Sequence, residues 1–324
     1  MDSVSCSISI VSCAFNEQEC ISQLVHRLQN LARLEGQYEF SFVIVDNGSQ
    51  DATWSKLVDA TAGDSRFHLL QLSRNFGTDG GLTAGLSVVD ADACVLMAAD
   101  LQDPPEMISE FLRKWEEGYE NIYMVVTGRP DSSALRRLLS RLFYFIIDRL
   151  TAGMIPRGVS DFRLVDRKVY EAVRNLPESS QFLRGMFAWV GFKSIGVPSV
   201  RPDRFAGRSK ASFRAVSRLA RVGVVSFTDI PLRMITWVAI ASSSIAFLLF
   251  GINVVLKFVL GAPRGFASLL GFLLLGFGAL SFMLAVIAQY LSVVHSEVKS
   301  RPTYIVSRQI RQHGSPSSSK SQDQ

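Results

Sequence analysis

Two oxygen-bearing side chains, those of Asp100 and Gln102, come directly after an apolar run from Cys94 to Ala99. The run is typical of a buried strand, and Pro104 and Pro105 behind it can open a helix but cannot continue a strand. Because ligands bind at the carboxyl ends of the strands in open α/β sheets, the two side chains could hold a hard divalent cation such as Mg²⁺. The competing interpretation is that Asp100 only caps the helix after Pro104.

Further apolar segments alternate with helix-like segments along the first half of the chain. Strands are predicted at Ile8–Ser12, Phe40–Val45, Phe67–Leu72, Cys94–Ala99 and Ile122–Thr127. This alternation is typical of an α/β protein with a mainly parallel sheet, and the polar residues that end each strand then share one edge. Neither a Walker loop nor a GxGxxG motif occurs, so a nucleotide site at this edge has to be built from carboxylates and amides.

The apolar composition points to a membrane. Hydrophobic residues make up 48% of the 324 residues, and two stretches, about 233–258 and 266–294, are long enough as helices to cross a hydrocarbon core of about 30 Å. We therefore expect residues 1–230 to form a cytoplasmic domain and 231–295 a transmembrane hairpin. Residues 296–324 would be a cytoplasmic tail, disordered from about residue 312.

Charge gives the orientation. Eight basic residues between positions 201 and 233 precede the first predicted span, whereas the loop between the spans carries only Lys257 and Arg264. Both termini are therefore expected on the cytoplasmic side of the inner membrane. The net charge of +5 fits an anionic lipid surface, and because no nucleic-acid-binding motif is present, no nucleic-acid partner is expected.

Two segments between the strands and the spans favour helices that lie in the membrane interface. In the first, near 135–150, leucines and aromatic residues share one helical face and arginines flank it. The second lies near 212–229. The four cysteines and four histidines form no cluster with metal-ligand spacing, so thiol or histidine chemistry is not indicated.

Several motifs resemble one known family. They are SRNFG from Ser73, ADLQDPPE from Ala99, GVSDFRLVDR from Gly158, FLRGMFAWVGF from Phe182 and RFAGRSK from Arg204. The order of these motifs and the two C-terminal spans resemble the family 2 glycosyltransferases with a GT-A (Rossmann-like) fold. Within that family the chain is most similar to the polyprenyl-phosphate glycosyltransferases, which include bacterial undecaprenyl-phosphate glucosyltransferases and dolichol-phosphate mannose synthase. The resemblance runs from about Ile8 to about Val306.

The resemblance implies a role for particular residues. The nucleotide sugar would be bound by Asn16, Glu17, Asp46, Asn47, Ser49, Arg74, Gly77 and Asp100. Mg²⁺ or Mn²⁺ would be held by Asp100 and Gln102, and Asp161 would be the catalytic carboxylate. The lipid phosphate would be bound by Arg129, Arg136, Ser140, Arg204 and Lys210. For Asp46, the alternative is that it only forms a turn, and for the arginines it is a solvated basic face.

The implied reaction is an inverting transfer of glucose from UDP-glucose to undecaprenyl phosphate. The acceptor phosphate is already largely ionised near pH 7, so Asp161 is expected to align the reactants more than to abstract a proton. Alternatives are another donor (UDP-GlcNAc, GDP-mannose or an aminoarabinose nucleotide) and a non-catalytic membrane-bound paralogue. A homo-oligomer, as a dimer or tetramer in the membrane, would agree with the family.

The sequence departs from the family at several positions. Ala98 stands where the first Asp of an Asp-Ala-Asp motif is usual, and Asn47 stands where a second Asp is usual. The missing carboxylate at Ala98 removes a negative charge from the predicted metal site and is expected to weaken it, although Mg²⁺ commonly completes its coordination with water and substrate phosphates.

Overall fold

The computed structural model describes residues 6–127, 158–176, 182–200, 235–242, 244–245, 248, 252, 266–299 and 301–311. The two predicted interfacial helices and most of the first predicted span lie outside these residues, as does the tail from residue 312. The chain divides into two compact units. The first comprises Met1–Val216 together with Pro302–Gln324, and the second comprises Ser217–Arg301.

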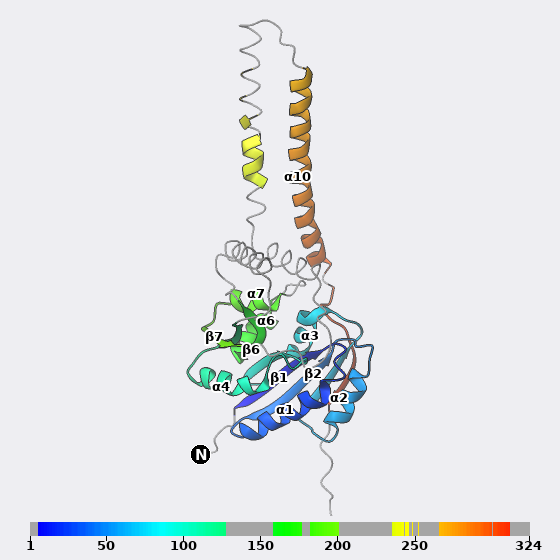
Figure 1. Ribbon diagram of the computed structural model, residues 1–324, viewed down its shortest axis with the longest axis vertical. Helices are drawn as coiled ribbons and strands as arrows, with labels where there is room; N and C mark the ends of the chain where they lie inside the picture. The colour runs from blue at the N-terminus through cyan, green and yellow to red at the C-terminus, as the bar shows by residue number, and fades with distance from the viewer. Residues whose placement is uncertain are drawn as a thin grey trace, which may run out of the picture. The chain divides into compact units, whose positions relative to one another are not determined.

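The first unit is organised around one eight-stranded sheet (Figure 1). Its strands are β1 (Ser7–Ala14), β2 (Glu39–Asp46), β3 (Phe67–Leu72), β4 (Ala93–Ala98), β5 (Asn121–Val126), β6 (Val159–Asp166), β7 (Ser194–Ser199) and β8 (Val306–Arg311). Their order across the sheet is β7-β5-β6-β4-β1-β2-β3-β8. The pairings β1–β2, β1–β4, β2–β3 and β5–β7 are parallel, and those of β6 with β4 and β5 and of β8 with β3 are antiparallel. The predicted mixed, mainly parallel α/β sheet is confirmed.

Helices cover both faces of this sheet (Figure 1). Their bounds are α1 (Ile21–Leu34), α2 (Thr53–Thr61), α3 (Gly77–Leu86), α4 (Ile108–Glu116), α6 (Arg167–Arg174) and α7 (Leu183–Trp189), with a 3₁₀ turn at Pro105–Met107 before α4. Apolar residues of α1, α2 and α4 form one core with the strand residues that face them, such as Ile10, Phe42 and Val95. The helices α3, α6 and α7 lie on the opposite face.

Glycine lets α3 lie unusually close to the sheet. A Cβ atom on Gly81 would come within 2.3 Å of Cys13 Sγ, and one on Gly85 within 2.3 Å of Val11 Cγ1. Real Cβ atoms do not approach so closely, so larger side chains at these two positions would push the helix away. The sequence of α3 therefore fixes the distance between its N-terminus and the ends of β1 and β2.

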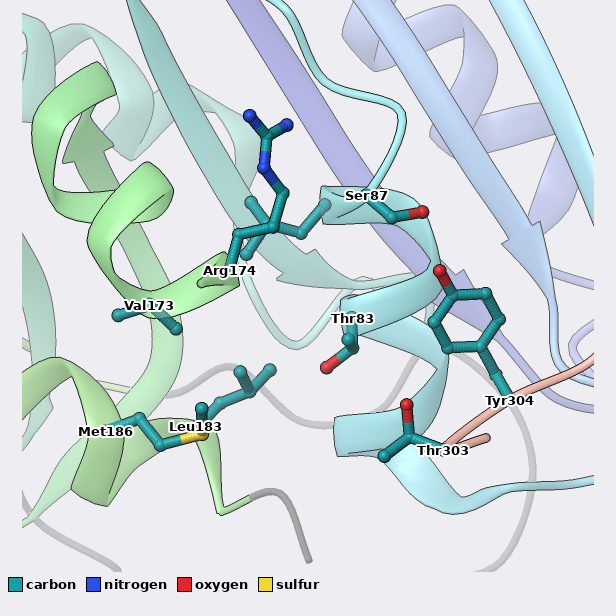
Figure 2. A pocket seen from close by; sticks show the side chains of 9 residues that line it. Thr83, Ser87, Val173, Arg174, Leu183, Met186, Thr303 and Tyr304 are labelled. Carbon is teal, nitrogen blue, oxygen red and sulfur yellow. The ribbon is translucent and has the colours of Figure 1, made fainter. Parts of the chain in front are cut away.

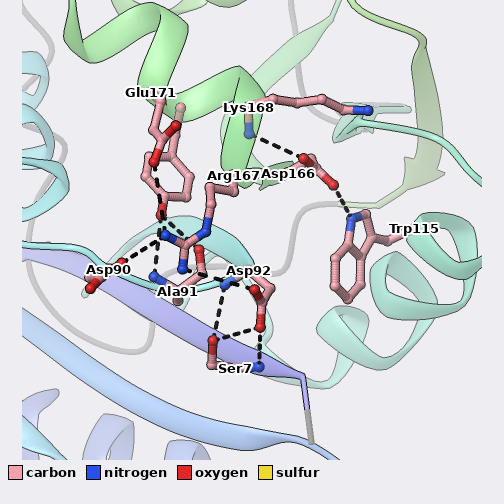
Figure 3. A network of polar contacts seen from close by, with 10 residues as sticks. Ser7, Asp90, Ala91, Asp92, Trp115, Asp166, Arg167, Lys168 and Glu171 are labelled. Carbon is pink, nitrogen blue, oxygen red and sulfur yellow. Dashed lines mark hydrogen bonds and ion pairs between the residues drawn. The ribbon is translucent and has the colours of Figure 1, made fainter. Parts of the chain in front are cut away.

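At the amino ends of β1 and β4, a network of polar contacts links the strand ends to each other and to α4 and α6 (Figure 3). The Asp92 carboxylate accepts hydrogen bonds from the backbone N–H of Ser7 at 2.9 Å and from its hydroxyl at 2.8 Å. The Arg167 guanidinium contacts Asp90 at 2.8 Å, and the Trp115 indole N–H donates to Asp166 at 2.8 Å. These contacts fix the strand ends that lie away from the predicted ligand edge, so we assign them a structural role.

The strand β8 is one that the sequence analysis did not anticipate. It follows the long helix α10 (Phe266–Val298) and pairs with β3, and the Ser73 N–H donates to the Ile305 carbonyl at 2.9 Å just beyond this pairing. Its six residues carry two arginines and almost no buried side chain, a pattern that lacks the apolar alternation of a typical strand. The first unit is therefore built from both ends of the chain.

The second unit contains α10 and helical residues at 235–242. By length and hydropathy, none of the helices among the described residues qualifies as a membrane span. The two predicted transmembrane helices therefore stay a prediction.

Candidate functional site

The loops after β1 and β2 are joined by hydrogen bonds between their polar residues. Asn16 has a φ of 53°, a left-handed conformation that asparagine tolerates better than most residues. In this conformation its N–H donates to Ser49 Oγ at 2.9 Å, and its side-chain oxygen accepts from the Gln50 N–H at 2.8 Å. The Glu17 N–H donates to Thr53 Oγ1 at 2.9 Å. Asn16, Glu17 and Ser49 are half-buried and lie together; their predicted role in binding the nucleotide sugar stays a prediction.

Asn47 joins the β2 loop to the loop after β3. It is buried, its Nδ2 donates to the Gly77 carbonyl at 2.7 Å, and its Oδ1 accepts from the Phe76 N–H at 2.9 Å. An aspartate at this position could not donate to the carbonyl. Asn47, where the family usually has an aspartate, therefore links the two loops through hydrogen bonds from an uncharged side chain.

The exposed Arg74 lies on the loop after β3, with its guanidinium 4.0 Å from the centre of the Phe76 ring. Its backbone is so close to Gly48 that a Cβ atom there would meet the Arg74 carbonyl carbon at 2.4 Å. Gly48 also has a φ of 69°, so the close approach and the turn both require glycine. The backbone of Arg74 is therefore held against the turn at Gly48, and its predicted role in binding the donor stays a prediction.

Asp46 lies beneath these loops and not at their surface. Its carboxylate is fully buried and accepts hydrogen bonds from the Ser49 N–H at 3.0 Å and from Gln71 Nε2 at 3.0 Å. The turn-forming role that the sequence left open is thus observed. Asp46 supports the residues that face the edge of the sheet.

The predicted metal-binding turn follows β4. Asp100 and Gln102 are both half-buried, and Leu101 between them has a φ of 61°, which is uncommon for a leucine. The Leu101 side chain is buried in the core, and the Gln102 N–H donates to Asp100 Oδ1 at 3.2 Å. No side chain caps the helical turn at Pro105–Met107, so the capping alternative for Asp100 is not supported. Strained backbone of this kind is found at ligand-binding turns.

The negative charges at this edge of the sheet affect the pKa of the nearby Cys20 thiol. Burial, and then the negative charges of Glu17 and Asp100, raise the pKa of the Cys20 thiol to about 11. Within the described residues, no group of three or more His, Cys, Asp or Glu side chains could hold a metal ion. Asp100 and Gln102 would supply two oxygen ligands to a cation, and such oxygens suit Mg²⁺ or Mn²⁺, whose coordination water and a diphosphate can complete.

Asp161 reaches the same edge through β6. In the antiparallel pairing of β4 with β6, Ala93 lies opposite Asp166 and Leu96 opposite Arg163. Beyond the last printed pair, continuing this register by two residues would bring Asp161 level with Ala98, next to the turn that carries Asp100. The Asp161 carboxylate is bound by Arg184 of α7, from Nε to Oδ1 at 2.5 Å and from Nη2 to Oδ2 at 2.6 Å.

Two further charged residues surround this ion pair, and neither was assigned from the sequence. Arg163 is buried, and its guanidinium lies 4.7 Å from the centre of the Phe187 ring of α7. Burial lowers the pKa of this guanidinium to about 10. Asp79 comes from α3, and burial followed by the charge of Asp161 raises the pKa of its carboxyl to about 7. Arg184 and Asp79 do occur within or beside the FLRG and SRNFG motifs, which was the available signal.

The predicted lipid-phosphate residues lie outside the described residues; they are Arg129, Arg136, Ser140, Arg204 and Lys210. A cavity of about 200 Å³ lies on the face of the sheet that α3, α6 and α7 cover. Figure 2 shows Thr83, Arg174, Met186 and Tyr304 around it. It combines hydroxyl groups and apolar side chains with a single charged residue.

Comparison with known proteins gives consistent results. The model of the glycosyl transferase family 2 matches residues 9–174. An uncharacterised glycosyltransferase of Synechocystis sp. is 37% identical over 93% of this chain and 94% of its own. A prophage-derived bactoprenol glucosyl transferase of Shigella flexneri is 34% identical over 94% of this chain and 98% of its own. Among solved structures, glucosyl-3-phosphoglycerate synthase from Mycobacterium tuberculosis in complex with UDP is 16% identical, with a TM-score of 0.48 over 68% of this chain and 79% of that one.

Proposed function

This chain belongs to glycosyl transferase family 2, and we propose that it transfers glucose from UDP-glucose to a polyprenyl phosphate, with inversion at the anomeric carbon. The chain is a glycosyltransferase. The observation that carries the proposed acceptor and sugar is the similarity, along 92–94% of the chain, to several proteins named bactoprenol glucosyl transferase.

The edge of the sheet supports the donor half of the proposal. Loops after β1, β2 and β3 are tied together by Asn16, Ser49 and Asn47, and Asp100 follows β4, the strand that pairs in parallel with β1. This arrangement offers backbone and amide groups for a nucleoside and a carboxylate for a cation. A divalent cation held by Asp100 and Gln102 would neutralise the diphosphate of the donor and the charge that develops on it as the sugar leaves.

The chemistry needs little from a base. An oxygen of the lipid phosphate attacks the anomeric carbon from the side opposite the diphosphate. The bond from that carbon to the diphosphate oxygen breaks, and its electron pair leaves with UDP. Because a phosphate monoester has a second pKa of about 6, its attacking oxygen is already ionised at neutral pH. The residues at the edge of the sheet therefore have to bring the reactants together in line.

The proposal also places the protein at the cytoplasmic face of the inner membrane, with both termini on that side. The support is the pair of apolar segments at about 233–258 and 266–294 and the basic residues outside them. In α10 large apolar side chains are exposed along the helix, for example Leu269 at 59%, Phe277 at 70% and Leu291 at 64%. An apolar surface of this extent needs a partner, and lipid is the partner that a polyprenyl substrate requires.

A transfer assay tests the proposal. Purified full-length protein in detergent is given undecaprenyl phosphate and, in turn, labelled UDP-glucose, UDP-GlcNAc and GDP-mannose, each with Mg²⁺, Mn²⁺ or EDTA. We expect label from UDP-glucose in the lipid phase, and no transfer with EDTA. Transfer from another donor would correct the sugar, and no transfer from any donor would contradict the proposal.

The variant Ala98→Asp addresses the missing carboxylate in the same assay. Because Ala98 ends β4 beside the metal-binding turn, an added carboxylate is expected to lower the Mg²⁺ concentration needed for half-maximal transfer. If wild type is inactive and Ala98→Asp is active, the chain has lost catalysis through this substitution.

A further inference from the structure

Arg184 holds the carboxylate that the family pattern identifies as catalytic. The guanidinium of this α7 residue faces Asp161 with two of its N–H groups, at 2.5 and 2.6 Å, which is the bidentate geometry of a strong arginine–carboxylate pair. The two side chains are 33% and 24% exposed, so both are partly accessible to a ligand.

The charges around this pair are balanced. Arg163 lies beneath it, buried against Phe187 and donating from Nη2 to the Ser160 carbonyl at 3.1 Å. Asp79 of α3 is close enough for its charge to act on Asp161 and both arginines. Two carboxylates and two guanidinium groups together carry no net charge when all are ionised. When Asp79 is protonated the group is positive by one unit and favours an incoming anion.

The acceptor brings a second anion to this place. In the proposed reaction the lipid phosphate has to reach the anomeric carbon, and the register of β4 with β6 places Asp161 beside the donor's metal-binding turn. A dianionic phosphate would be repelled by a bare Asp161 carboxylate in a partly desolvated site. A guanidinium between the two removes that repulsion, since its planar fork can bind oxyanions along more than one edge.

We propose that Arg184 binds the phosphate of the acceptor and that Asp161 is the positioning residue that orients Arg184. This inference rests on the proposed function. The acceptor oxygen attacks without transferring a proton to Asp161, and α7 becomes the element that determines the position of the acceptor. The buried Arg163 of β6 contacts the ring of Phe187 with its guanidinium, and this contact holds α7 against β6.

Binding and transfer measurements on the full-length protein test this role. The variants are Arg184→Gln, Arg184→Lys, Asp161→Asn and the double variant. Binding of farnesyl phosphate is measured by calorimetry, with farnesol as the ligand that lacks phosphate, and transfer is measured against undecaprenyl phosphate and against donor concentration. Arg167→Gln is the matched control, because Arg167 also pairs with an acidic residue but lies at the other end of β6.

We expect Arg184→Gln and Asp161→Asn each to raise the KM for the lipid phosphate and the Kd for farnesyl phosphate by at least about tenfold, the size of one lost charged contact. The KM for the donor and the slow hydrolysis of the donor by water should change less than about twofold, since neither involves the phosphate. The double variant should be no weaker than the worse single variant, because the two residues act as one unit. Arg184→Lys should recover part of the affinity.

Other outcomes separate this inference from the proposed function. If wild type transfers sugar but Arg184→Gln binds farnesyl phosphate as wild type does, Arg184 has no role in acceptor binding and the inference is wrong. If Asp161→Asn lowers kcat at unchanged acceptor affinity, Asp161 acts as a base and the inference is again wrong. If wild type transfers no sugar, the proposed function fails, and this inference fails with it. Unfolding temperatures near wild type show that a variant is folded.

Discussion

Asp100 shows how one residue's backbone surroundings decide its chemistry. The Leu101 side chain is buried in the core, whereas its neighbours Asp100 and Gln102 are only half-buried. The left-handed backbone conformation of Leu101 forms the turn that separates the two polar side chains from the core. The sequence predicted this turn because an apolar strand stops abruptly at a carboxylate. The strain at Leu101 was not predictable, because it follows from the position of the core pocket that receives the side chain.

Replacing Asp100 by alanine is expected to lower the rate of sugar transfer by about 100-fold or more, since its carboxylate is the proposed charged ligand for the cation. Asp90→Ala, at an exposed acidic residue of the polar network at the amino ends, is the control and should keep nearly full activity. Transfer rates at saturating Mg²⁺ measure the difference. Activity of Asp100→Ala near the control would show that the cation is bound elsewhere.

Asp79 is expected to make stability depend on pH. Burial, followed by the charge of Asp161, raises the pKa of its carboxyl to about 7 in the folded protein, whereas the unfolded chain has a pKa of about 3.9. Between these values the folded state binds the proton more tightly, so the free energy of unfolding contributed by Asp79 is largest below pH 4. It falls as the pH rises to 7 and is then constant.

Thermal unfolding of wild type and Asp79→Asn between pH 4.5 and 8 measures this contribution. The difference in Tm between the two proteins should shift in favour of the variant as pH rises, since the amide has no proton to lose. Asp90→Asn, at an exposed position, should run parallel to wild type. A constant difference between wild type and Asp79→Asn would contradict the raised pKa.

At the scale of elements, the predictable parts were those with local signals. The five predicted strands match β1 to β5 within one or two residues at each end, because each is an apolar run bounded by polar residues. The pair of Asp161 with Arg184 was not predictable, since its partners are 23 positions apart and meet only because α7 packs against β6. Both residues lie within motifs that resemble the family, GVSDFRLVDR and FLRGMFAWVGF, but a resemblance in sequence does not show which side chains are in contact.

The close approach of α3 to the sheet can be tested at Gly85. Alanine there would place a Cβ atom 2.3 Å from Val11 Cγ1 and 3.2 Å from Val45 Cγ2, so the helix or the strand has to shift. We expect Gly85→Ala to lower the free energy of unfolding by about 1–3 kcal/mol, as for other overpacked cores. Because the N-terminus of α3 carries Gly77, which is predicted to bind the donor, the KM for the donor should also rise.

Gly36→Ala is the matched control for this variant, because its nearest neighbour would be 3.7 Å away, an ordinary contact. Chemical denaturation of both variants gives the two free energies. Equal stability of Gly85→Ala and Gly36→Ala would mean that α3 can move from the sheet without cost, and that its glycines do not fix the donor loops.

At the scale of the whole molecule, the second unit is expected to attach the enzyme to the membrane. Full-length protein should sediment with the membrane fraction, resist extraction at high pH and be released by detergent, because the proposal assigns lipid as the partner of the apolar side chains exposed on α10. In inside-out vesicles, protease should reach the sheet domain, whose proposed position is cytoplasmic. Release of the protein by high pH or by salt alone would contradict insertion and indicate a surface attachment.

The antiparallel pairing of β8 with β3 has a consequence for the synthesis of the protein. Ser307 hydrogen-bonds to the Gln71 carbonyl across 236 positions of sequence, and the last strand comes from the C-terminal end of the described chain. While the ribosome makes the residues in between, β3 is the exposed margin of an incomplete sheet, and such margins are the places where chains associate wrongly. The apolar segments at about 233–258 and 266–294 are made during this interval, so the proposed membrane insertion would precede completion of the sheet. The nascent enzyme would then reach the lipid that carries its proposed acceptor before its own fold is complete.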